Sequence, residues 1–206
     1  MRSPASWAAY MGAVAVPYLA VASVPAAIAG LLLDDLIDEV LSVPVVIATT
    51  LILYGIGFII MESKKDRKTT VNSLGELSFK HALGIGAFQM LALIPGTSRS
   101  GSTILGASLL GTSRTVAAEF SFFMAIPVML GASGLKMAKC FLLDGYSFNG
   151  WQWLILGVAT VVSFVVSLLV IRGLMAFIKK HSFKPFGWYR IVLGAVVLLC
   201  VAMNWL

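Results

Sequence analysis

Long apolar stretches, separated by short polar or charged segments, set the pattern of this chain. An α-helix needs about 20 apolar residues to cross a hydrocarbon core roughly 30 Å thick. Prolines and small residues within the first stretch are tolerated in membrane helices. The sequence therefore predicts five spanning helices, over residues 7–33, 40–61, 115–137, 151–171 and 187–206.

The stretch between the second and third of these helices has a different pattern. Residues 82–94 are apolar but too few to span a bilayer, and residues 104–110 form a second short apolar piece. The polar break Pro95–Thr103 separates the two. We predict that residues 82–113 form a re-entrant helical hairpin, which enters and leaves the membrane on the same side.

Charged residues between the stretches indicate the topology. Basic residues gather within 62–81 and 172–184, and such clusters favour the cytoplasmic side. Two spans and a hairpin that does not cross lie between these loops, so both loops can be cytoplasmic. The acidic loop Asp34–Glu39, residues 138–150 and the C-terminus are then expected outside.

The composition agrees with a membrane protein. Hydrophobic residues make up 59% of the chain and charged residues 12%, whereas soluble domains are about half apolar and a quarter charged. We expect an all-α polytopic protein with residues 1–206 in a single integral membrane domain. The net charge of +6 belongs to the loops and does not form the basic face of a nucleic-acid-binding protein. Cys140 and Cys200 lack metal-ligand spacing, and we predict no metal site from this chain's own residues.

The candidate functional centre is the polar break Pro95–Thr103. It packs five hydroxyls, one arginine and two glycines between apolar flanks. Non-helical backbone at membrane depth needs polar partners, and an arginine there costs about 2.5 kcal/mol or more unless it is paired. A bound anion would meet both demands. The alternative is that Arg99 snorkels to an interface while the serines and glycines serve close helix packing.

The residue types of the break suit phosphate in particular. Its glycines allow a tight loop, and we expect Ser100 or Ser102 to cap a helix that begins near Thr103. The positive end of that helix would face the same space as Arg99. The Arg99 guanidinium can clamp two oxygens, while neighbouring hydroxyls donate further hydrogen bonds.

A longer segment around the break resembles a known family. The segment Phe88-Gln-Met-Leu-Ala-Leu-Ile-Pro-Gly-Thr-Ser-Arg-Ser-Gly-Ser-Thr-Ile104, followed by Glu119-Phe-Ser-Phe and Ala125-Ile-Pro127, resembles the second signature region of undecaprenyl-diphosphate phosphatases of the bacitracin-resistance type. The resemblance implies that the terminal phosphate is removed from a C55 isoprenyl diphosphate, which regenerates the lipid carrier for cell-wall glycans. It also implies a multi-pass protein of the bacterial plasma membrane, a polyprenyl diphosphate substrate and a divalent cation, Mg or Ca.

The resemblance implies specific roles for residues of the polar break. Charge stabilisation by Arg99 and an orienting or nucleophile-side hydroxyl at Ser98 would serve phosphoryl transfer. The predicted catalytic residues are Arg99 and Ser98, and the predicted substrate-binding residues are Gly96, Thr97, Ser100, Gly101, Ser102 and Thr103.

One part of the family's pattern does not occur in this sequence. The family also has an N-terminal Glu-rich motif and a Pro-x-Ser-Ser-Thr-Gly-His motif, and it is built as an inverted repeat with two re-entrant hairpins. The chain resembles such a protein with half of the repeat largely missing, as in a truncated gene model or a real fragment. We therefore expect little hydrolysis from this chain alone.

Two further alternatives stay open. A membrane transporter or lipid flippase would also place an anion site at a broken helix near the midplane. The sequence leaves open whether the chain forms a homo-oligomer.

Overall fold

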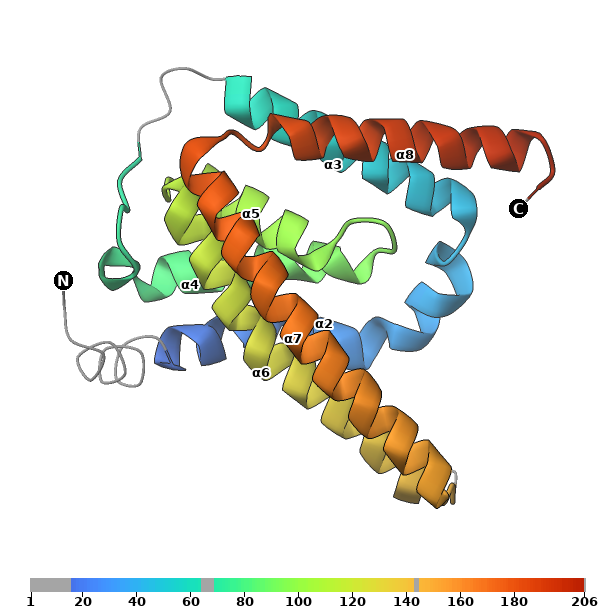
Figure 1. The fold of residues 1–206 in the computed structure, drawn as a ribbon. Coiled ribbons are helices and arrows are strands. Elements are labelled where there is room, and N and C mark those ends of the chain that lie inside the picture. The colour runs from blue at the N-terminus through green and yellow to red at the C-terminus, as the bar shows by residue number, and fades with distance from the viewer. Residues whose placement is uncertain (1–15, 64–68, 143–144, 206) are drawn as a thin grey trace. The chain divides into compact units, whose positions relative to one another are not determined.

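The computed structural model describes residues 16–63, 69–142 and 145–205. Helices make up most of this part of the chain (Figure 1). They are α2 (Val16–Leu41), α3 (Pro44–Ser63), α4 (Phe79–Met90), α5 (Arg99–Leu109), α6 (Arg114–Leu142), α7 (Gly150–Lys180) and α8 (Lys184–Ala202), with one-turn 3₁₀ helices η2 (Leu74–Glu76) and η3 (Leu91–Leu93).

Five of these helices are long and apolar enough to cross a membrane, namely α2, α3, α6, α7 and α8. The prediction of an all-α polytopic membrane protein is therefore confirmed. The first nine residues of the first predicted span, 7–15, lie outside the described residues.

Two predicted loops were wrong because the helices beside them continue. The acidic segment Asp34–Glu39 belongs to α2, which ends at Leu41, and the turn comes just before Pro44. The segment has neither proline nor glycine to stop a helix, whereas Pro44 suits the first position of the next one. Likewise α7 runs on to Lys180, so the predicted loop 172–184 shrinks to its last few residues.

The chain divides into two compact units, Met1–Pro127 with Ser182–Leu206, and Val128–His181. The single membrane domain predicted over 1–206 stays a prediction. In the second unit, Trp153 stacks on Phe141, with ring centroids 6.1 Å apart. Residues 150–173 of α7 are all exposed, and Ile178 near its end is buried. An apolar helix that is exposed all round is typical of one that faces lipid.

In the first unit, α3 and α8 pack side by side in opposite directions (Figure 1). Gly55 faces Gly187 near one end of the pair, and Ala48 faces Gly194 near the other. A Cβ atom at Gly55 would lie 2.6 Å from the carbonyl oxygen of Gly187. Only glycines let the two backbones approach so closely, which is a common way for membrane helices to associate.

The predicted hairpin is present as α4, η3 and α5, and α4 and α5 pack against each other (Figure 1). Its two ends are tied together by backbone hydrogen bonds. Thr70 N and Val71 N donate to the carbonyl oxygen of Gly111 over 2.8 and 3.2 Å, and Ser113 N donates to that of Val71 over 2.9 Å. The chain thus enters and leaves the hairpin at one place, although its placement in a membrane stays a prediction.

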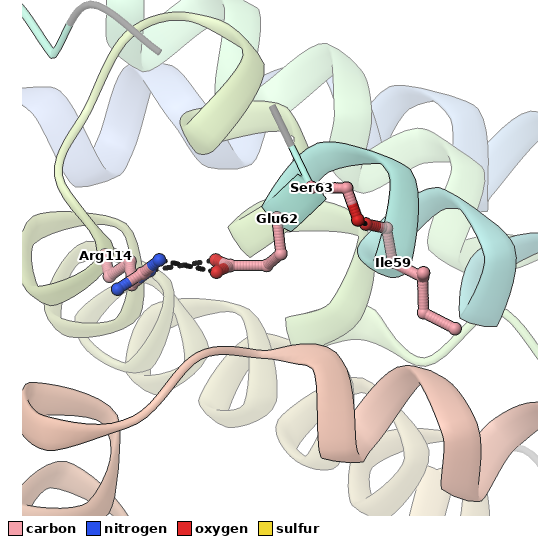
Figure 2. A network of polar contacts seen from close by, with 4 residues as sticks. All are labelled: Ile59, Glu62, Ser63 and Arg114. Atoms are coloured by element: carbon pink, nitrogen blue, oxygen red, sulfur yellow. Dashed lines mark hydrogen bonds and ion pairs between the residues drawn. The ribbon is translucent and has the colours of Figure 1, made fainter. Parts of the chain in front are cut away.

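Other elements of the first unit surround this hairpin. Helix α2 lies along α4, where the rings of Tyr18 and Phe79 are 4.6 Å apart. Near the point where the hairpin begins and ends, Arg114 of α6 pairs with Glu62 in the last turn of α3 (Figure 2). The neighbouring Ser63 hydroxyl donates to the carbonyl of Ile59 within α3. The C-terminal end of α3 therefore lies beside the start of α6. Both ends of the hairpin meet at the same side of this unit.

Candidate anion-binding site

The polar break lies level with the middle of α3. The Tyr54 hydroxyl is 2.8 Å from Ser102 Oγ, and the Thr50 hydroxyl donates to the carbonyl of Pro95 over 2.7 Å. Since α3 runs from Pro44 to Ser63, Tyr54 stands at its midpoint. A membrane-spanning α3 would therefore place the break near the centre of the bilayer.

The helix after the break begins one turn earlier than predicted. Ser98 is the N-cap residue of α5, and its Oγ accepts a hydrogen bond from Gly101 N over 3.4 Å. The expectation of a helix from about Thr103, capped by Ser100 or Ser102, was wrong, because Arg99 and Ser100 already adopt the helical conformation. The positive end of α5 therefore lies at Ser98–Gly101.

The backbone before α5 has an uncommon conformation. Gly96 has a φ of 87°, and a Cβ atom there would lie 2.3 Å from Thr50 Oγ1. Ser98 has a φ of 60° and a ψ of 121°, a backbone conformation that residues other than glycine rarely adopt. Such strain costs of order 1–3 kcal/mol and gathers at ligand sites, where the surroundings enforce it.

Arg99 makes its hydrogen bonds to neutral groups. Its Nε and Nη2 donate to Oε1 of Gln89 over 3.1 and 2.9 Å, and Nη2 also donates to the carbonyl of Met124 over 2.7 Å. Among the residues that the structure describes, no carboxylate forms a salt bridge with Arg99. Hydrogen bonds to neutral groups therefore hold the Arg99 guanidinium in place.

A second arginine reaches the same helix end from α8. Arg190 Nη1 donates to the carbonyl of Thr97 over 3.2 Å, and its Nη2 would be 2.9 Å from a Cβ atom at Gly101. The guanidinium carbon lies 5.8 Å from the ring centre of Phe58, within cation–π range. Arg190 is not among the site residues predicted from the sequence, although a lone arginine in an apolar span is a usable signal.

Three of the predicted substrate-binding hydroxyls have partners inside the protein. Ser102 bonds to Tyr54, whereas Thr103 donates to the carbonyls of Arg99 and Ser100 and contacts Ser121. The Thr97 hydroxyl donates to the carbonyls of Leu91, over 2.9 Å, and Ile94. These bonds tie Thr97 back to η3 and Ile94, and they tie the start of α5 to α3 and α6. The predicted site residues all lie in or just before the first turns of α5. The catalytic roles of Ser98 and Arg99 stay predictions, and so do the substrate-binding roles of Gly96, Thr97, Ser100, Gly101, Ser102 and Thr103.

Titratable side chains near the start of the hairpin are engaged locally. Glu76 accepts hydrogen bonds from Asn72 N over 2.7 Å and from the Ser73 hydroxyl over 3.0 Å. These bonds, chiefly the one from Asn72, hold the pKa of Glu76 below its ordinary value. His81 forms a capping box with Ser78 at the start of α4. In the described segments, no three His, Cys, Asp or Glu side chains gather as metal ligands would.

Comparison with known proteins gives one consistent family. Residues 5–196 match the family model described as bacitracin resistance protein BacA. An undecaprenyl-diphosphatase of Enterococcus faecalis is 54% identical over 186 residues, which cover 90% of this chain and 66% of the relative. Undecaprenyl-diphosphatase 1 of Clostridioides difficile is 56% identical over 178 residues, which cover 86% of this chain and 63% of the relative. The chain thus spans just under two thirds of these relatives' length.

Proposed function

We propose, since this chain belongs to the bacitracin resistance protein BacA family, that it serves the hydrolysis of undecaprenyl diphosphate to undecaprenyl phosphate and phosphate. Relatives at 52–56% identity are named for this activity. The reaction would return a lipid carrier to cell-wall synthesis and would oppose bacitracin. These names do not favour the alternative of a transporter or flippase.

One observation carries the proposal. Arg99 and Arg190 flank the N-terminal end of α5, and neither meets a carboxylate among the residues described. Two cations and the free N–H groups of a helix end together suit an anion of more than one charge. The diphosphate of a membrane lipid meets this need and can reach the middle of the bilayer while its tail stays in the hydrocarbon.

The arrangement suggests how these groups would act on the reacting phosphate. Hydrolysis forms a bond between a water oxygen and the terminal phosphorus and breaks the bond between that phosphorus and the bridging oxygen, on which negative charge grows. Arg99 and the α5 helix end would stabilise this charge, which is the main protein contribution in phosphoryl transfer. Ser98, at the cap of α5, would orient the terminal phosphate, or would attack it to form a phosphoserine that water then hydrolyses to release phosphate. Its strained backbone supports this role, because strain is commonly kept where a group must be held for function.

The divalent cation implied by the family is also part of the proposal. The chemistry that it would supply is charge neutralisation on the phosphate oxygens. The side chains of the described segments form no ligand cluster that would hold it. We further propose that the protein lies in the bacterial plasma membrane and binds a polyprenyl diphosphate lipid as its substrate. Whether it forms a homo-oligomer stays an open question.

Phosphate release from undecaprenyl diphosphate tests the proposal. We would measure it for the chain in detergent micelles, alone and co-expressed with the part of the E. faecalis relative that the chain does not match. Arg99→Ala should lower the rate about a hundredfold or more, and Arg99→Lys should restore little because the planar fork is lost. Arg172→Ala, on the exposed face of α7, is the matched control. No release in either format would contradict the reaction, and normal turnover by Arg99→Ala would contradict the site.

A further inference from the structure

Gln89 is a buried glutamine whose amide orientation can be assigned. It lies near the end of α4, and 2% of its surface is exposed. Its Oε1 faces Nε and Nη2 of Arg99. A guanidinium has only donors, so the atom that faces it must be the oxygen. The remaining atom of the amide is therefore the nitrogen Nε2.

This nitrogen has no hydrogen-bond acceptor. Nε2 of Gln89 is fully buried and makes no hydrogen bond to any residue in the described part of the chain. The great majority of buried side-chain polar atoms in folded proteins have a partner. An acceptor for Nε2 is therefore missing beside Arg99 among the described residues.

We propose that Gln89 binds the substrate through this nitrogen, donating a hydrogen bond from Nε2 to a phosphate oxygen while Oε1 holds Arg99. The inference rests on the proposed function and adds a binding residue to its site. The residue type fits this double task. A glutamate would hold Arg99 equally well, but it would neutralise the guanidinium and repel the diphosphate, whereas an amide keeps the positive charge and adds a donor.

Selective ¹⁵N labelling of glutamine side chains gives a direct test. The chain has two glutamines, Gln89 and Gln152. Gln152 lies on α7, where it is exposed and caps the helix with Asn149, so it is an internal control. During titration with undecaprenyl diphosphate in micelles, the Nε2 signal of Gln89 should shift and saturate, and that of Gln152 should stay. Gln89→Met and Gln152→Met would assign the two signals.

Binding of undecaprenyl diphosphate to variants provides the second readout. Gln89→Met and Gln89→Glu should each weaken binding about tenfold or more, as expected for a lost bond to a charged group. Gln152→Met should bind like the original chain, and thermal unfolding would confirm that each variant is folded. An unshifted Gln89 signal during saturable binding, or normal affinity of Gln89→Glu, would overturn the inference. No saturable binding by the original chain would instead refute the proposed function.

Discussion

The Glu62 carboxylate and the Arg114 guanidinium form a two-point ion pair in which the acid is buried and the base is exposed. Oε1 lies 2.9 Å from Nε and Oε2 lies 2.6 Å from Nη2 (Figure 2). The Glu62 side chain is 1% exposed, whereas that of Arg114 is 48% exposed. Loss of the cation would leave a buried carboxylate unpaired, but loss of the anion would leave an arginine that reaches water.

We therefore predict unequal effects of breaking this pair from its two sides. Arg114→Met should lower the free energy of unfolding by about 3 kcal/mol. Glu62→Gln, which keeps the shape of the side chain, should lower it by about 1 kcal/mol or less. Unfolding by SDS in mixed micelles would measure both, with Arg172→Met as the control. Equal losses, or a larger loss for Glu62→Gln, would contradict the role of burial.

Arg190 should matter for affinity as well as for the fold. Its guanidinium holds the carbonyl of Thr97 beside the α5 helix end. We expect Arg190→Ala to weaken undecaprenyl diphosphate binding about tenfold or more, because it removes a charge and lets the loop move. Arg190→Lys should recover only part of the loss, since an ammonium lacks the planar fork. Affinity unchanged in Arg190→Ala would separate this residue from the site.

The close approach of α3 and α8 should depend on Gly55. A methyl group there meets the Gly187 carbonyl, so Gly55→Ala should lower the free energy of unfolding by about 1–3 kcal/mol. The matched control is Gly157→Ala on α7, where nothing lies within 4 Å of the added carbon. That variant should be neutral or slightly stabilising because alanine favours a helix over glycine. Similar losses at both glycines would show that packing is not the cause.

The predicted topology can be tested by labelling single cysteines. In a background with Cys140→Ser and Cys200→Ser, cysteines replacing Ser63 and Ser182 should react with an impermeant reagent from the cytoplasmic side. A cysteine replacing Ser147 should react from outside. Labelling of the first two positions from opposite faces would mean that the hairpin crosses the membrane.

The hydrophobic pattern predicted the main elements of the fold but not their ends. Five spans and a short hairpin follow from segment length and polarity alone. The end of a helix depends on local stop signals, and the charged residues Asp34–Glu39 are not such a signal. Their polarity predicts a loop, yet a helix that leaves the apolar region can continue through them.

The candidate site shows the same limit at the level of single residues. The break and Arg99 could be found from the sequence, since a polar run with an arginine is unusual in apolar surroundings. The partners of the site could not. Arg190 is far from the break along the chain, and only the antiparallel packing of α3 and α8 brings it to Thr97. The positive φ of Ser98 has no sequence signal either, because serine does not require it.

The short helices of the hairpin have a consequence for how the protein is made. With 12 and 11 residues, α4 and α5 are each too short to be inserted into a bilayer as separate spanning segments during synthesis. We expect the hairpin to enter the membrane as one unit against α2 and α3, whose contacts shield its polar tip. The hydrogen bonds of Thr70 and Val71 to Gly111 can form only once α5 is complete. Segment length thus makes insertion of the functional loop depend on the longer helices that contact it.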